Sequence, residues 1–206
     1  MSGTKTLRFG LIGASNIARK HAAALVRIPN ANLLAVADLE QARAEALCSE
    51  FNIPTAYSSY EQMLESEQLD VVCVLTPSGQ HATVTADVAD SRRHVVVEKP
   101  MALTVFDADN QLRICERNNV KLFVVKQNRF SRPVVALKHA IDNGYFGQIV
   151  LGSVRVRWCR HQSYYDSAKW RGTWAHDGGV LSNQASHHID LMQWLLGDVT
   201  SVMAMN

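Results

Sequence analysis

Short apolar runs alternate along the first part of the chain with longer segments in which apolar residues recur three and four positions apart. A run of about four to eight apolar residues indicates a buried strand, and the longer period indicates a helix. Their alternation predicts parallel β-α-β units, and so an α/β fold with a doubly wound Rossmann sheet. The runs expected to be strands are 7–12, 33–37, 71–75, 94–97 and 121–125, and the repeat of the pattern brings the sheet to six strands.

Polar residues predict where several helices of this part begin. Ser59 is followed three residues later by Gln62, and Thr104 by Asp107. At this spacing the first hydroxyl accepts a hydrogen bond from the backbone amide three residues on. We therefore expect helices to start after Ser59 and after Thr104, in addition to those over 17–28 and 81–90.

The pattern changes after residue 126. Two helices are expected beyond it, over 133–143 and over 185–196, the second ended by Gly197. We therefore expect two domains: a Rossmann domain over 1–126 and a second α/β domain over 127–206.

Between these two helices, residues 149–158 alternate strictly between apolar and polar positions, with Arg155 and Arg157 on the same side. Strict alternation predicts a strand with one wet or ligand-facing side, as in an antiparallel sheet. A further strand is expected over 199–205. The second domain is therefore expected to hold a mainly antiparallel sheet that is incomplete at its carboxyl end.

Composition limits the classes of partner. The chain has 206 residues, 47% hydrophobic and 19% charged, with a net charge of +2. These values are typical of a globular protein, and the scattered basic residues argue against nucleic acid or an anionic membrane surface as the main partner. No apolar run approaches the ~18 residues of a membrane span and no secretory leader is visible, so we expect a cytoplasmic protein. Reduced thiols are expected at the four dispersed cysteines, Cys48, Cys73, Cys115 and Cys159.

The turn after the first expected strand has the spacing of a dinucleotide-binding motif, with Ser15 in place of the second glycine. Gly13 permits the tight turn, and the first amides of the following helix can hold a pyrophosphate. The motif alone is weak, because many such turns bind no nucleotide. The residues expected to contact the cofactor here are Gly13, Ser15, Asn16 and Ile17.

Asp38 strengthens this prediction because it ends the second expected strand, about 20 residues beyond the glycines. A carboxylate there accepts hydrogen bonds from the adenosine ribose and repels a 2′-phosphate, which favours NAD over NADP. The alternative is a plain turn or helix-cap aspartate. The loop that carries Thr76, Pro77 and His81 is expected to contact the cofactor as well, although an ordinary β-α turn would have the same composition.

Glu98-Lys99-Pro100 ends a buried apolar strand, and with the preceding motifs the chain resembles the Gfo/Idh/MocA family of oxidoreductases over essentially residues 7–206. The resemblance implies a Rossmann domain followed by an α/β substrate and dimerisation domain. It also implies that Glu98 and Lys99 lie at the cofactor, and that Lys99 binds the substrate hydroxyl and tunes proton transfer. The alternative for Lys99 is a surface-directed lysine at a strand end.

The second motif of that family corresponds here to residues 178–190. The resemblance implies that His187 is the general base, and Asn183 stands where the family has a catalytic aspartate. An amide can hold a sugar hydroxyl but cannot relay a proton, so His187 must act alone or with Lys99. Asp190 either orients His187 or forms a structural ion pair. A metal site at His187 and His188 is disfavoured because adjacent helical residues point about 100° apart, and none is expected.

Segments 126–130, 154–160, 170–174 and 183–188 carry a finer resemblance. Together they resemble the branch of the family that oxidises C3 of UDP-N-acetylglucosaminuronic acid, in the synthesis of bacterial surface polysaccharide. The substrate's carboxylate and diphosphate would suit arginine, which binds both bidentately. Arg155, Arg157 and Arg160 are the candidates, and an ordinary charged sheet face is the alternative. Tyr164, Tyr165 and the tryptophans are the expected stacking surfaces for this substrate. The resemblance also implies that Gln127, Trp170 and Arg171 lie near the nicotinamide.

The function expected from the sequence is therefore NAD-dependent oxidation of a sugar, with a small-molecule substrate and a homo-oligomeric protein. The alternative is a non-catalytic NAD or sugar sensor, or an inactive truncated member of the same fold. Family members carry more chain after the histidine helix, so the resemblance implies a fragment, a truncated product or a variant that completes its sheet between subunits.

Overall fold

A computed structural model describes residues 5–205 of the chain. The chain divides into two compact units, 1–125 and 126–206, a boundary one residue from the one expected. Each unit is described by itself below.

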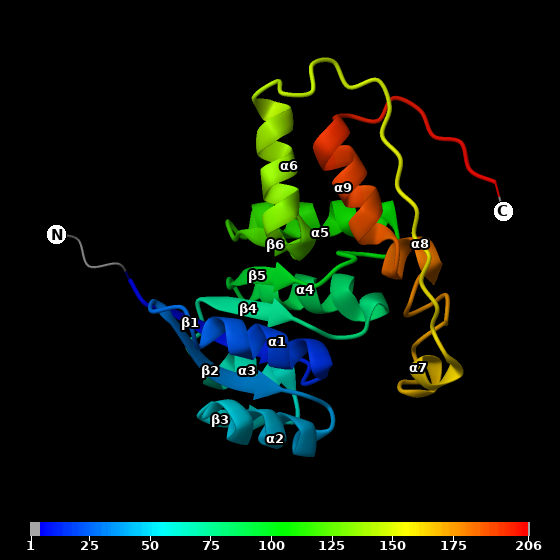
Figure 1. The fold of residues 1–206 in the computed structure, drawn as a ribbon. Helices are drawn as coiled ribbons and strands as arrows, with labels where there is room; N and C mark the ends of the chain where they lie inside the picture. Colours follow the sequence, from blue (N-terminus) through cyan, green and yellow to red (C-terminus); the bar gives the residue numbers. More distant parts are fainter. Residues whose placement is uncertain (1–4, 206) are drawn as a thin grey trace. The chain divides into compact units, whose positions relative to one another are not determined.

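The first unit is built on a six-stranded parallel sheet in the order β3-β2-β1-β4-β5-β6, and in Figure 1 the strand labels run from β3 at the bottom to β6 above. This is the doubly wound Rossmann order expected from the sequence. The strands are β1 (Leu7–Ile12), β2 (Ala31–Ala37), β3 (Thr55–Tyr57), β4 (Val71–Val74), β5 (His94–Val97) and β6 (Leu122–Val124).

Helices connect the strands and cover both faces of this sheet. They are α1 (Asn16–Leu25), α2 (Gln41–Phe51), α3 (Tyr60–Ser66), η1 (Ser78–Gln80), α4 (His81–Asp90) and α5 (Val105–Arg117). Consecutive strand residues belong to different apolar clusters: Leu11 packs with α1 and α2, whereas Ile12 packs with α3, α4 and α5. The buried strands of a parallel sheet are apolar on both sides for this reason.

Both predicted helix starts are confirmed. The Ser59 hydroxyl accepts from the backbone amide of Gln62 at 3.2 Å, and the Thr104 hydroxyl accepts from that of Asp107 at 3.1 Å. Each bond satisfies one of the first helical amides, which have no partner within the helix. Local sequence was sufficient here because donor and acceptor are three residues apart.

Strand order decides where a ligand can bind in this unit. β1 pairs with β2 on one side and with β4 on the other, so the connections diverge between β1 and β4. In open α/β sheets the ligand crevice lies at the carboxyl ends of the strands at such a point. The loops after Ile12 and Val74, whose Cα atoms are register partners, therefore face this crevice.

The regular elements of the second unit, over the residues described, are all helices joined by irregular segments. Its elements are η2 (Gln127–Phe130), α6 (Arg132–Asp142), α7 (Gln162–Asp166), α8 (Gly179–Asn183) and α9 (Ser186–Leu196). The helices expected over 133–143 and 185–196 are confirmed within one residue at each end.

The two strands expected in this unit are not formed. Residues 149–158 and 199–205 have no regular secondary structure, so these two predictions were wrong, and with them the antiparallel sheet. Alternation of side chains favours an extended backbone, but a strand also needs a neighbour for its N–H and C=O groups. Among residues 5–205 neither segment has such a neighbour.

These two segments leave apolar side chains in water. Val150 is 91% exposed, Leu151 84%, Met203 90% and Met205 94%. Extended apolar segments without a pairing partner tend to recruit another chain. We expect the 206-residue chain to associate through its second unit, so that light scattering gives a mass that rises with concentration.

A matched pair of variants locates this association. Val150→Asp is expected to lower the mass toward that of a monomer, whereas Val105→Asp, at a 78% exposed position of the first unit, should leave it unchanged. A wild-type chain that stays a monodisperse monomer at all concentrations would contradict the prediction.

Candidate functional site

The turn after β1 has room only for glycine at its centre. Gly13 has φ +101°, and a Cβ atom there would lie 2.8 Å from the carbonyl oxygen of Leu75. Its own amide donates to the carbonyl of Ala37 at 2.7 Å, which holds the turn against β2. The turn thus brings the chain to Ser15, which precedes the first turn of α1. The backbone amides of Asn16 and Ile17, the first two of this helix, are the groups that a phosphate would meet there.

The Asp38 side chain is hydrogen-bonded to the backbone of this turn. Its Oδ2 accepts from the backbone amide of Ala14 at 2.7 Å, and its Oδ1 accepts from that of Glu40 at 2.9 Å. The second bond is a local turn, so part of the alternative interpretation is correct. A carboxylate has about four acceptor positions, so two amides leave capacity for ribose hydroxyls. The structure therefore places the Asp38 carboxylate at the Gly13 turn, and its predicted contact with the cofactor stays a prediction.

His81 has a different position from the one expected for a cofactor contact. It is 1% exposed, and its ring nitrogens lie 2.8 Å from the Thr76 carbonyl and 2.6 Å from that of Pro100. Burial lowers the pKa of the imidazole, and the two carbonyls oppose that shift only in part. His81 therefore joins the Thr76-Pro77 loop to the Lys99-Pro100 loop instead of pointing outward.

Glu98 is likewise engaged within the protein. Its Oε1 lies 2.9 Å from His21 Nε2, and its Oε2 accepts from the Lys99 amide at 3.0 Å. Burial by itself raises the pKa of this carboxyl, but the His21 contact and the Lys99 amide outweigh burial and hold the pKa below its ordinary value. The ionised carboxylate thus anchors the backbone that carries Lys99, before the cis Lys99-Pro100 peptide.

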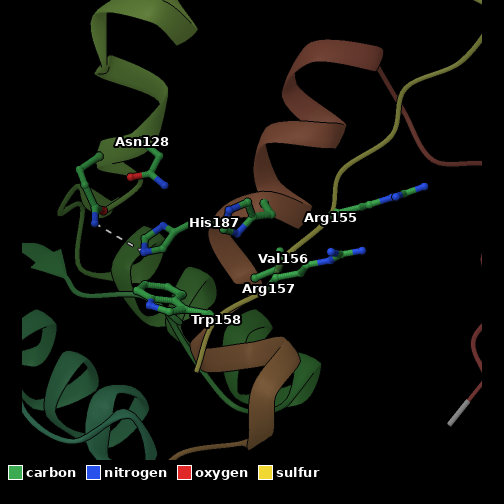
Figure 2. Close-up of a pocket in the computed structure, with 8 residues that line it drawn as sticks. Asn128, Arg155, Val156, Arg157, Trp158 and His187 are labelled. Carbon is green, nitrogen blue, oxygen red and sulfur yellow. Dashed lines mark hydrogen bonds between the residues drawn. The ribbon is translucent and has the colours of Figure 1, made fainter. Parts of the chain in front are cut away.

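A pocket of about 560 Å³ lies within the second unit (Figure 2). Four of the residues predicted to bind substrate or cofactor line it: Gln127, Arg155, Arg157 and His187. Arg155 and Arg157 extend from one segment in the same direction. The other lining residues are Asn128, Val156, Trp158 and His188.

His187 is one of two imidazole rings at the wall of this pocket, with His188. Its Nε2 lies 3.5 Å from the side-chain nitrogen of Gln127, the contact that Figure 2 marks with a dashed line. The contact places the Gln127 side-chain amide beside the imidazole ring.

The carboxylate of Asp190 is engaged by two basic side chains of the second unit. Its two carboxylate oxygens accept from Arg129 Nε at 2.8 Å and from the terminal nitrogen at 2.6 Å, and Lys126 Nζ lies 3.7 Å away. Burial raises the pKa of this carboxyl, but Arg129 and Lys126 lower it overall. The structural ion pair, which the sequence left open, is the arrangement found, and it fixes α9 to η2.

Arg160 and Arg171 lie in an alternating stack with aromatic rings. The Arg160 guanidinium is 3.9 Å from the Trp158 ring centre and 4.7 Å from that of Tyr164. Arg171 is 4.2 Å from the Tyr164 ring centre and 4.8 Å from that of Trp170. Such contacts are attractive and leave the guanidinium edges to donate hydrogen bonds. Arg160 thus joins the pocket wall at Trp158, and Arg171 belongs to the same stack.

Asn183 lies on α8, outside the residues that line the pocket, and is 8% exposed. Its side-chain amide donates to the carboxylate of Asp177, which is 5% exposed and also accepts from the Gly172 amide at 2.7 Å. Sequence reasoning missed Asp177. Its position directly before Gly178-Gly179 was the available signal.

Metal ligation was considered for His187 and His188. Within residues 5–205, no group of three or more His, Cys, Asp or Glu side chains is placed to hold a metal ion. In the same range, no helix combines the length and apolar character needed to cross a bilayer.

Two family models match this chain. Residues 7–126 match the oxidoreductase family with an NAD-binding Rossmann fold, GFO/IDH/MocA, and residues 134–206 match its C-terminal domain. Together they cover both units.

Two solved structures are similar over most of the chain. The WlbA dehydrogenase of Chromobacterium violaceum, in complex with NADH and UDP-GlcNAcA, is 38% identical with a TM-score of 0.90, over 95% of this chain and 56% of that one. The WlbA dehydrogenase of Bordetella pertussis, with the same ligands, is 39% identical with a TM-score of 0.90, over 94% and 58%.

Among characterised proteins, myo-inositol 2-dehydrogenase of Thermotoga maritima is 26% identical over 193 residues, which is 93% of this chain and 55% of that protein. The chain therefore spans a little over half the length of the relatives it matches.

Proposed function

Because this chain belongs to the Gfo/Idh/MocA oxidoreductase family, we propose that it oxidises a sugar hydroxyl and transfers the hydride to NAD. The observation that carries the proposal is the cradle at Gly13. A side chain there would meet the Leu75 carbonyl, and Asp38 is bonded to the next amide of the same turn. These residues fit a dinucleotide: Gly13, Ser15, Asn16 and Ile17 would hold its pyrophosphate, and Asp38 its adenosine ribose.

For the substrate we propose UDP-N-acetylglucosaminuronic acid, oxidised at C3, as a precursor of surface-polysaccharide sugars. The two WlbA dehydrogenases support this choice, since their structures hold UDP-GlcNAcA at 38% and 39% identity. The pocket supports it chemically, because Arg155 and Arg157 line it. Guanidinium groups bind carboxylates and diphosphates in bidentate geometry.

In the proposed reaction, each of these residues has a separate role. NAD, when bound, accepts the hydride that leaves the substrate carbon. The imidazole of His187 removes the proton of the C3 hydroxyl, so that carbon and oxygen lose one hydride and one proton and become a ketone. Lys99 donates a hydrogen bond to that oxygen and stabilises its negative charge. Asn183 holds a sugar hydroxyl. Gln127 orients His187, and Trp170 and Arg171 are assigned to the nicotinamide side.

Glu98 and His81 act on this machinery indirectly in the proposal. The Glu98 carboxylate accepts from the Lys99 amide, and His81 spans the Thr76 and Pro100 carbonyls. Both therefore set the backbone of the Thr76-Pro77 and Lys99 loops and do not themselves touch the cofactor.

The proposal is tested by incubating the protein with NAD and following NADH absorbance. UDP-N-acetylglucosaminuronic acid is the test substrate, UDP-N-acetylglucosamine lacks only its carboxylate, and myo-inositol represents the other relatives. NADH formation with the uronic acid, and much less with the other two, is the expected result. Faster turnover of myo-inositol than of both UDP-sugars would make a polyol, not the uronic acid, the assigned substrate. NAD binding without turnover of any of the three compounds would favour a sensor.

Cofactor choice follows from Asp38. We expect NAD to bind at least about tenfold more tightly than NADP, because a carboxylate beside a 2′-phosphate costs several kcal/mol and 1.4 kcal/mol is tenfold. Titration of tryptophan fluorescence with both cofactors measures the ratio. Asp38→Ser should reduce the preference for NAD over NADP, whereas Glu40→Ser, at an exposed neighbouring position, should leave that preference unchanged. Equal or tighter NADP binding by the wild type would refute the assignment.

A further inference from the structure

The carboxylate of Asp177 and the side-chain amide of Asn183 form a buried pair within the second unit. Their residues are 5% and 8% exposed. Asp177 accepts from the Asn183 side-chain nitrogen and, through its other oxygen, from the Gly172 backbone amide at 2.7 Å. The pair thus joins α8 to the loop that follows Trp170 and Arg171.

A carboxylate determines the orientation of a side-chain amide that faces it. An asparagine side chain carries donors on one side and an acceptor on the other, and it can turn over at little steric cost. An ionised carboxylate only accepts, so it binds the NH₂ side and repels the carbonyl side. Asp177 therefore selects one of the two orientations of Asn183.

We propose that Asp177 is a positioning residue, which holds Asn183 with its carbonyl oxygen directed away from Asp177 as the acceptor for a substrate hydroxyl. This rests on the proposed function, because it deepens the role given there to Asn183. The Gly172 backbone amide holds one oxygen of Asp177 independently of Asn183, and the other oxygen accepts from the Asn183 side chain.

The pair also explains why an amide occupies position 183. An aspartate there would place a second carboxylate against Asp177 in a buried site, where like charges at contact distance cannot both ionise. One of the two would take up a proton and lose its place as a defined acceptor. With asparagine, the acceptor faces the substrate without a second buried charge, and the proton of the reaction passes to His187.

The first test is a double-mutant cycle on the full chain. Asp177→Asn leaves an amide against an amide, so Asn183 can turn over and present NH₂ where an acceptor is needed. We expect kcat with UDP-N-acetylglucosaminuronic acid to fall by about 5- to 100-fold, the range for one unmatched buried hydrogen bond. The Michaelis constant for NAD should stay within about twofold.

The informative comparison is the same change in the Asn183→Ala background. If Asp177 acts through Asn183, Asp177→Asn should cause no further loss of kcat there, whereas a general structural role would add its full effect. Additive losses would therefore overturn the proposal. Asp166→Asn is the matched control, because Asp166 also accepts from a side-chain amide, that of Gln162 at 2.9 Å, but is exposed.

The second test exchanges the two side chains. In Asp177→Asn/Asn183→Asp, the new amide at 177 can accept from Gly172 and donate to the new carboxylate at 183, which keeps an acceptor for substrate. We expect this double variant to recover most of the kcat that Asp177→Asn loses, and Asn183→Asp alone to stay impaired. A double variant no more active than Asp177→Asn would contradict the proposal.

A third measurement does not depend on turnover and separates this inference from the proposed function. The side-chain NH₂ signals of Asn183 in a ¹H–¹⁵N spectrum are identified by their loss in Asn183→Asp. We expect them to exchange slowly with water in the wild type and at least about tenfold faster in Asp177→Asn, because a buried hydrogen bond protects them. Unchanged exchange would overturn the inference, whereas an inactive wild type with protected signals would overturn only the proposed function.

Discussion

His187→Ala is expected to lower kcat by about 10²–10⁴-fold, the usual contribution of a positioned general base. The reason is the imidazole ring beside Gln127 at the pocket wall, which alanine removes without a substitute. NAD affinity should change by no more than a few-fold, since the cradle at Gly13 and Asp38 belongs to the first unit. Initial rates of NADH formation and fluorescence titration with NAD measure the two quantities.

The control for this variant is His139→Ala, an exposed histidine of α6 that does not line the pocket. Its rate should match the wild type. Lys99→Ala should behave as His187→Ala does, with Lys121→Ala, at the opposite end of the parallel strands, as its control. Near-normal turnover by His187→Ala on a substrate that the wild type oxidises would show that the assigned mechanism is wrong.

Gly13→Ala is expected to destabilise the first unit and to weaken NAD binding together. The positive φ by itself costs an L-residue about 1–3 kcal/mol, and the new Cβ would lie 2.8 Å from the Leu75 carbonyl oxygen. At about 2–4 °C per kcal/mol for a chain of this size, thermal unfolding should begin several degrees lower. Because the turn must move to relieve the contact, NAD affinity should fall by about tenfold or more, on the premise that backbone here approaches the pyrophosphate.

Gly144→Ala separates the cost of the positive φ from that of the contact with the Leu75 carbonyl. Gly144 also has a positive φ, +73°, but a Cβ there would meet nothing within 4 Å. This variant should show the backbone penalty without the clash and should bind NAD normally. Equal loss of NAD affinity in both variants would mean that the contact with Leu75 is not what limits position 13.

The fold of the first unit could be predicted from the sequence because the interactions that determine it are local or periodic. The hydroxyls of Ser59 and Thr104 meet amides three residues away, as predicted. The apolar strands are buried on both sides by helices that the same pattern predicted, and His94–Val97 was predicted residue for residue. The Gly13 turn and Asp38 also lie together, since parallel strands place their carboxyl ends at one edge of the sheet.

Side-chain partners across long separations were predicted less well. His81 and Glu98 were expected to face the cofactor, but each is bonded to the protein's own backbone or to His21. Residue type and spacing indicate that a polar group belongs to the edge of the sheet. They do not indicate which of several acceptors or donors it will meet, because these come from loops distant in the sequence.

The sequence by itself determined which segments can form strands or helices, which turn requires glycine, and which residues are the candidates for acid-base chemistry. Tertiary structure alone decided that residues 149–158 stay irregular, since a strand exists only where another backbone supplies its hydrogen bonds. It likewise decided that Asp190 pairs with Arg129 and that Asn183 faces Asp177. Such pairings depend on which of many polar groups folding brings within about 3 Å, a distance that no local pattern of residues encodes.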